Sequence, residues 1–310
     1  MSLKIAVDAG HGYVKAVKSM DQHILFPSLI CPLPPSVDLG DLSQSESITI
    51  DGQPYLVGET ARQLATPLWN RNKATDPDTL RLMLVAAAQL GAAGPVALAT
   101  GLPLSWFGSQ RISFKDTLIG YGGVVQIPGQ PPRRLWIESV KVLPQGVAAA
   151  SALMASTDHG PGDYLVADLG YRTTDFIIVT KTATGTIRFE PSQAGSLEIG
   201  THAVASLIAQ GLEQDYRIPF KPIEVESVRQ VFIEGHPIDV TSRRGVAIDA
   251  ISRQLRAVLA EKLDEKMLKV VGIILCGGGA SVLSSAFPRP VVTADSQWAN
   301  AQAYLTALEG

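Results

Sequence analysis

Residues 3–15 read LKIAVDAGHGYVK, and this stretch decides the fold. The apolar run from Leu3 to Val7, with its β-branched residues, predicts a buried strand that ends at Asp8. Gly10–Gly12 predicts a turn, and residues 13–18 predict a second strand. The segment is therefore interpreted as a β-hairpin with a carboxylate at the end of its first strand.

A similar pattern occurs about half a chain further on. Residues 164–179 read YLVADLGYRTTDFIIV, which again predicts a buried strand, an Asp-x-Gly turn and a second strand. In this copy Asp168 and Asp175 have the same spacing as Asp8 and Lys15 in the first. The repeat indicates a weak internal duplication and predicts two similar domains that face each other.

The rest of the chain alternates strands and helices. We expect helices at 57–64, 78–90, 105–118, 145–154, 199–212, 242–268 and 297–308, and further strands at 47–50, 95–100, 122–127, 133–142, 186–190, 270–276 and 291–293. Pro144 is expected to open its helix, because proline is well placed in a first helical turn. The pattern favours an α/β fold, in which ligands bind at the carboxyl ends of strands.

Composition and charge limit the classes of protein that are possible. The chain has 310 residues, 46% of them hydrophobic and 18% charged, with a net charge of -3. This balance is typical of a globular protein and shows no electrostatic footprint for general nucleic-acid or membrane binding. Two cysteines are too few for a disulfide framework. With no signal-peptide pattern and no apolar run of about 20 residues, we expect a cytoplasmic protein.

The first turn has the residue types that bind phosphate and magnesium. Asp8 can hold Mg²⁺ through water, the glycines allow backbone N–H groups to point at phosphate oxygens, and Lys15 can add a point charge. An ordinary Asp-Gly hairpin turn is the alternative interpretation. In the second turn, Thr173 and Thr174 can add hydroxyl donors.

A third glycine-rich turn follows a buried strand near the C-terminus. Cys276-Gly277-Gly278-Gly279-Ala280 lets a flat ligand or a phosphate approach the backbone, and the helix that follows favours negative charge. A simple strand-to-helix loop is the alternative. The spacing does not match GxGxxG, which counts against a Rossmann dinucleotide site.

These three turns, in this order, resemble those of the actin, heat-shock chaperone and sugar kinase superfamily. Thr100-Gly101-Leu102-Pro103 and the segment 295–301 resemble those of the actin-like proteins of the ParM/StbA type in particular. The resemblance implies two ribonuclease H-like domains that flank a nucleotide cleft. Domain I would span residues 1–143, with an inserted subdomain near 20–70 and the helix at 297–310 packed back on it. Domain II would span 144–296, with a helical subdomain near 203–250.

The resemblance also implies residue roles. Asp8 and Asp168 would hold Mg²⁺ through water, while Gln145 would orient the attacking water and Asp175 would polarise it. The residues that would contact ATP or ADP are Gly10, His11, Gly12, Tyr13, Lys15, Gly170, Tyr171, Arg172, Thr173, Glu198, Gly200, Thr201, Gly277, Gly278 and Gly279. Gln145 stands where ParM-type proteins have a Glu, and it is a weaker base than a carboxylate.

Bulky residues in both turns depart from the family pattern. His11 and Tyr13 replace the usual Ser, Thr or Asn of the first turn, and Tyr171-Arg172 replaces the small residues of the second. We therefore expect slow hydrolysis. The function implied is a filament-forming ATPase for plasmid or DNA segregation, with copies of itself and a DNA-binding adaptor as partners. A small metabolic kinase and a non-polymerising nucleotide-dependent scaffold are the alternatives.

Overall fold

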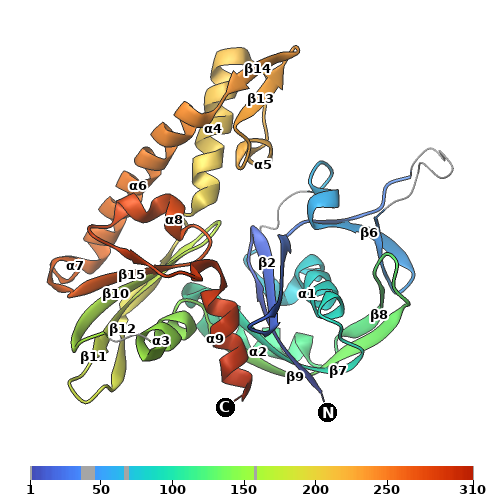
Figure 1. Cartoon of the computed structure of the whole chain (residues 1–310), viewed down its shortest axis with the longest axis horizontal. Helices are drawn as coiled ribbons and strands as arrows, with labels where there is room; N and C mark the ends of the chain where they lie inside the picture. The colour runs from blue at the N-terminus through green and yellow to red at the C-terminus, as the bar shows by residue number, and fades with distance from the viewer. Residues whose placement is uncertain (1, 36–45, 66–69, 157–158, 310) are drawn as a thin grey trace. The chain divides into compact units, whose positions relative to one another are not determined.

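The chain folds into two compact units. The computed structural model describes residues 2–35, 46–65, 70–156 and 159–309. Unit 1 comprises residues 1–144 and 300–310, and unit 2 comprises residues 145–299. Each unit is built around its own β-sheet (Figure 1). Within the described ranges, every helix is too short or too polar to cross a membrane.

The sheet of unit 1 begins with a three-stranded antiparallel meander, which consists of β1 (Leu3–Ala9), β2 (Tyr13–Ser19) and β3 (Gln22–Pro27). On its other side β1 pairs in parallel with β7 (Gly94–Leu102), and β7 pairs in parallel with β9 (Arg133–Pro144). Beyond β9 the sheet continues through β8 (Gly122–Gln126), β5 (Ile48–Ile50), β6 (Gln53–Val57) and β4 (Ile30–Pro32). Residues 5–9 of β1 are all buried, as expected for a strand that is covered on both faces.

Three helices pack on this sheet: α1 (Pro77–Gln89), α2 (Leu104–Leu118) and α9 (Ala299–Glu309). Asp76 caps α1, because its carboxylate accepts a hydrogen bond from the N–H of Thr79. Tyr304 of α9 is fully buried. A Cβ on Gly101 would clash with the Tyr304 ring, so the glycine lets α9 pack against β7.

Unit 2 repeats this arrangement. An antiparallel meander of β10 (Gly162–Leu169), β11 (Thr174–Lys181) and β12 (Ile187–Leu197) is followed by the parallel strands β15 (Gly272–Cys276) and β16 (Val291–Val292). As in unit 1, the first strand of the meander pairs in parallel on its other side. The predicted duplication of strand, turn and strand is thus confirmed.

Helices cover both faces of the unit 2 sheet. Alternate residues of β10 point to opposite faces, so Leu165 and Val166 belong to different hydrophobic cores. One core contains residues of α4 (Thr201–Tyr216), α5 (Pro222–Val225), α6 (Thr241–Leu263), α7 (Lys266–Lys269) and α8 (Ala280–Leu283). The other contains residues of α3 (Val147–Ser156).

The structure corrects two predicted helices and adds a hairpin. Residues 57–64 form the end of β6 and a 3-10 helix over Gly58–Ala61, where the φ of Gly58 is 68°. The helix expected over 242–268 ends at Leu263, because Asp264 has a φ of 49°. A hairpin of β13 (Gln230–Ile233) and β14 (His236–Asp239) was not predicted. Its only local signal is the Glu234-Gly235 turn, in which both residues have positive φ.

Other segments also differ from the predictions, among them β12 and α4, which end at Leu197 and Tyr216, beyond their expected ends at 190 and 212. Residues 22–27 form β3 of the main sheet, although we expected an irregular segment there. Gly101 and Leu102 continue β7. Pro144 is the last residue of β9 and does not open a helix, because Gly146 has a φ of 73° and α3 begins only at Val147. Parts of the expected subdomain near 20–70, namely residues 36–45 and 66–69, lie outside the described residues.

Candidate functional site

The first turn joins β1 to β2 and begins at a partly buried ion pair. Asp8 and Lys15 lie directly opposite each other in the antiparallel pair, so their side chains share one face. Lys15 Nζ is 3.1 Å from Asp8 Oδ2, and the two side chains are 13% and 3% exposed. The structure thus brings together the two charged residues predicted for this turn.

Donors from elsewhere in unit 1 bind the carbonyl oxygens of the first turn. Lys73 Nζ donates to the carbonyl of Ala9 at 2.6 Å. The hydroxyl of Ser28 donates to the carbonyl of Gly10 at 2.6 Å, and the backbone N–H of Ser28 donates to the carbonyl of Gly12 at 2.8 Å. Lys73 is 3% exposed and Ser28 is fully buried. Neither was predicted, because no local motif marks a residue that contacts the turn from a distance in sequence.

Of the two bulky residues in the first turn, His11 packs through its side chain and Tyr13 closes the turn through its backbone. His11 is 8% exposed, and its ring meets the edge of Trp106 with 5.7 Å between centroids. Tyr13 begins β2, and its carbonyl accepts a hydrogen bond from the N–H of Gly10 at 3.2 Å. This bond closes the turn.

The second turn joins β10 to β11 and begins at two carboxylates. Asp168 and Asp175 lie directly opposite each other and are 8% and 2% exposed. Asp8 and Lys15 occupy the equivalent positions in the first turn. The Ser196 hydroxyl donates to Asp175. Like charges directly opposite each other in a sheet are destabilising. This pair of carboxylates therefore suits a position next to a cation.

The turn before α3 lies against the same two carboxylates. A Cβ on Gly146 would lie 3.3 Å from the Cβ of Asp175 and 3.8 Å from the Cβ of Asp168. Gln145, the preceding residue, is 8% exposed. Of the two predicted catalytic residues of unit 2, Asp175 thus lies opposite Asp168, and Gln145 lies in a turn, not in a helix, next to the glycine that approaches both carboxylates.

Backbone N–H groups bind the carbonyl oxygens of the second turn. Gly279 donates to Leu169 at 2.7 Å, Thr201 donates to Gly170 at 3.2 Å, and His202 donates to Tyr171 at 2.8 Å. The N–H of Gly170 donates to Thr173 at 2.8 Å, which matches the bond from Gly10 to Tyr13 in the first turn. The second turn is therefore supported by the glycine loop at 277–279 and by the start of α4.

Three glycines allow this close packing. A Cβ on Gly277, whose φ is 86°, would clash with Asp168, and a Cβ on Gly279 would lie 3.0 Å from the carbonyl oxygen of Leu169. A Cβ on Gly200 would lie 2.5 Å from the carbonyl oxygen of Tyr171. Gly278 has more room, since its Cβ would be 3.8 Å from the nearest atom of Gln297. Glu198 is exposed.

The bulky residues of the second turn form a cluster with His202. The Nδ1 atom of His202 is 3.1 Å from the hydroxyl of Tyr171, and the guanidinium carbon of Arg172 is 5.9 Å from the centre of the Tyr171 ring. Burial, and secondly the charge of Arg172, lower the pKa of His202 to about 4. Burial also lowers the pKa of Arg172. His202 is therefore neutral at pH 7; the sequence did not single it out.

The carboxylate of each turn has the chemistry to bind magnesium that a nucleotide carries. No group of three or more His, Cys, Asp or Glu residues gathers as a metal site in the described part of the chain. Mg²⁺ commonly keeps several waters and binds through one or two carboxylates together with phosphate oxygens. Asp8 and Asp168, each buried at the carboxyl end of a strand, are carboxylates of that kind.

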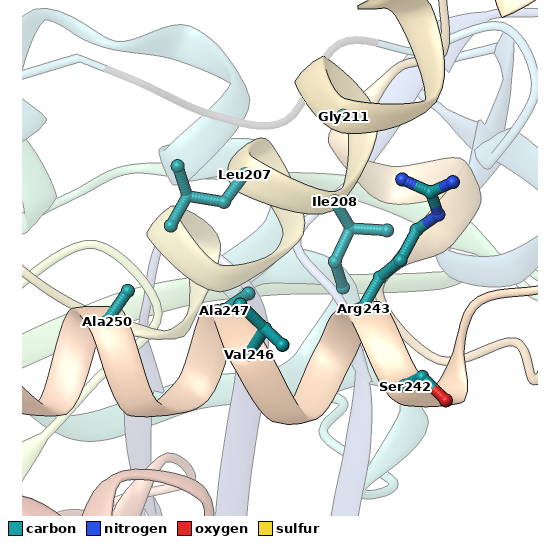
Figure 2. Close-up of a pocket in the computed structure, with 8 residues that line it drawn as sticks. All are labelled: Leu207, Ile208, Gly211, Ser242, Arg243, Val246, Ala247 and Ala250. Carbon is teal, nitrogen blue, oxygen red and sulfur yellow. The ribbon is translucent and has the colours of Figure 1, made fainter. Parts of the chain in front are cut away.

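A separate groove lies between α4 and α6. It measures about 460 Å³, and Figure 2 shows the residues that line it, among them Leu207, Ile208 and Val246. None of the residues predicted to contact nucleotide lines this groove.

Models of two protein families match consecutive parts of the chain. Residues 6–147 match the family of actin-like protein N-terminal domains, and residues 166–288 match the C-terminal domain family of the archaeal MreB-like actin homologue. No curated protein matches the chain in sequence.

Solved structures of actin-like proteins share the fold over nearly the whole chain. A non-polymerisable quadruple mutant of pCBH ParM has 19% identity and a TM-score of 0.84, with 100% of this chain and 99% of that chain covered. A 15-stranded ParM filament from Clostridium botulinum has 20% identity and a TM-score of 0.83, with 99% of each chain covered. The archaeal actin homologue Ta0583 in complex with ADP has 20% identity and a TM-score of 0.78, with 99% of each covered.

The two family matches follow one another along the chain, and each contains one of the two Asp-x-Gly turns. The predicted fold class, with its two actin-like domains, is confirmed, and the chain belongs to the actin-like proteins.

Proposed function

We propose that this protein binds ATP with Mg²⁺, hydrolyses it, and assembles into filaments for plasmid or DNA segregation. One observation carries the proposal. Two β-hairpins in different units place a buried carboxylate at the same register position, and in both turns the carbonyl oxygens are bonded to donors outside the turn. Such turns are suited to present N–H groups to phosphate oxygens.

Each turn has a defined part in this proposal. Asp8 and Asp168 hold Mg²⁺ through water, and Lys15 contacts the β- and γ-phosphates. Gln145 orients the attacking water, and Asp175 polarises it. The glycine loop at 277–279, with Glu198, Gly200 and Thr201, contacts the adenosine. When bound, Mg²⁺ would supply charge stabilisation for the γ-phosphoryl group as it passes to water and for the ADP that leaves.

Family membership supports both nucleotide binding and assembly. Ta0583, which shares the fold, has been solved with ADP, and a ParM that shares it has been solved as a filament. Head-to-tail contacts between unlike surfaces give open filaments when the rotation does not close. A DNA-binding adaptor is the further partner that we propose.

Titration calorimetry with ATP and Mg²⁺, followed by a phosphate-release assay, tests the nucleotide part. We expect wild type to bind ATP and to release phosphate slowly. Asp168→Ala should bind ATP without the Mg²⁺ dependence that wild type shows. Rapid ADP release that requires one small-molecule acceptor would instead identify a metabolic kinase. Tight ATP binding with neither turnover nor filaments would identify a scaffold.

A further inference from the structure

The two turns obtain their support in chemically different ways. In the second turn, the donors to the carbonyl oxygens are backbone N–H groups of Gly279, Thr201 and His202. In the first turn, two of the three donors are side chains, namely the ammonium of Lys73 and the hydroxyl of Ser28. Support from backbone groups survives most substitutions, whereas support from side chains depends on the identity of two residues.

We propose that Ser28 and Lys73 are positioning residues that hold the first turn in the shape in which its N–H groups face phosphate. The inference rests on the proposed function, namely that this turn binds ATP. In a planar trans peptide the carbonyl and the following N–H point in opposite directions. The Ser28 hydroxyl holds the Gly10 carbonyl, so the N–H of His11 points away from Ser28. The backbone N–H of Ser28 holds the Gly12 carbonyl, so the N–H of Tyr13 also points away from Ser28.

The anchors remove an electrostatic obstacle as well as fixing direction. A carbonyl oxygen carries partial negative charge and would repel a phosphate oxygen. Donors that are already in place before the ligand arrives cost no reorganisation when it binds. Ser28 holds the Gly10 carbonyl at 2.6 Å and so directs the N–H of His11. Lys73 holds the Ala9 carbonyl at 2.6 Å, and the N–H that follows it, on Gly10, donates to Tyr13, so Lys73 stabilises the bond that closes the turn.

The burial of Lys73 points to a role beyond packing. Its side chain is 3% exposed, and an ammonium is costly to bury unless it is paired or hydrogen-bonded. An apolar residue of the same length would fill the space without that cost. The ammonium instead binds the carbonyl that immediately precedes Gly10, at the end of β1.

Two variants with matched controls test the anchoring. Ser28→Ala and Lys73→Met each remove one anchor. Ser252→Ala removes a buried hydroxyl that bonds to Ser285 at 2.9 Å, and Lys141→Met removes a lysine that donates to the carbonyl of Ala307 at 2.6 Å. Affinities for ATP, ADP and adenosine are measured by calorimetry or by competition with a fluorescent nucleotide, and thermal unfolding is measured without ligand.

We expect each anchor variant to bind ATP and ADP about 10-fold more weakly or worse, which corresponds to the loss of about one hydrogen bond's worth of positioning. Adenosine affinity should stay within about 2-fold, because adenosine has no phosphate. The controls should match wild type for all three ligands, and Lys73→Arg, which keeps a charged donor, should recover most of the ATP affinity. If Ser28→Ala does not fold, Ser28→Cys, with its weak S–H donor, takes its place.

Three results would overturn the inference. Equal losses for adenosine and ATP would show a merely structural role. A loss in Lys73→Met without any loss at Ser28 would show that the charge of Lys73 acts directly and that anchoring does not matter. Wild-type ATP affinity in both variants would reject the anchoring while leaving the proposed function intact. By contrast, failure of wild type to bind ATP would reject the proposed function, and the anchoring with it.

Discussion

At the scale of single residues, Gln145 is the side chain whose proposed role is easiest to isolate. It is buried in the turn that lies against Asp168 and Asp175. We predict that Gln145→Ala slows phosphate release by about 10–100-fold, which is at or below the usual effect of a general acid or base. The affinity for ATP should change by less than about 2-fold. Single-turnover hydrolysis measures this, with the exposed Gln130→Ala as control. Normal hydrolysis by Gln145→Ala would reject the water-positioning role.

A second prediction for a single residue concerns His202 and the pH dependence of the free energy of unfolding. Its pKa falls from 6.5 to about 4 in the folded protein. Below pH 6.5 the unfolded chain takes up a proton that the folded protein does not, so the free energy of unfolding drops as the pH falls toward 4. We expect this loss to be on the order of 1–2 kcal/mol, because solvent screens a half-buried group.

Urea unfolding at pH 7 and pH 5 measures the contribution of His202. His202→Gln should lose less stability over this range than wild type. The exposed His236→Gln should behave as wild type. Equal pH dependence in His202→Gln and wild type would show that His202 is not the group responsible.

At the scale of elements, the glycine loop after β15 supports the second turn. Gly277 combines a φ of 86° with a position at which a Cβ would clash with Asp168. We predict that Gly277→Ala lowers the free energy of unfolding by roughly 3 kcal/mol, through backbone strain and overpacking together. Gly235 has a φ of 83° with nothing within 4 Å of its Cβ, so Gly235→Ala should cost only about 1 kcal/mol of strain. Equal losses in the two variants would show that crowding against Asp168 and the backbone of Leu169 contributes nothing.

At the scale of the whole molecule, the proposal concerns assembly. We predict that the protein sediments in the presence of ATP and Mg²⁺ and remains in the supernatant without nucleotide. Electron microscopy of the same samples should show filaments only with ATP, because the ligand shifts assembly only if it binds the assembled state more tightly. Asp168→Ala, which lacks a carboxylate proposed to hold Mg²⁺, should stay in the supernatant even with ATP and Mg²⁺. A monodisperse monomer at high concentration with ATP would contradict the proposal.

The two hairpins could be predicted from the sequence because their signals are local. A buried strand, an Asp-x-Gly turn and a second strand lie within about fifteen residues, so periodicity and glycine placement suffice. The same logic predicted α1 and α2 to within about one residue at each end. Local signals were misleading at Pro144, where proline suits a first helical turn but the strand pairing with β7 prevailed.

The sequence by itself determined the α/β fold, the duplicated hairpin and the positions of Asp8 and Asp168, because these follow from patterns between neighbouring residues. Only the tertiary structure decided what supports each turn. Lys73 reaches Ala9, and Gly279 reaches Leu169, across long separations in the chain. Hydrogen bonds of this kind depend on how the elements pack, and a single lysine or glycine gives no sign of its partner until the chain has folded.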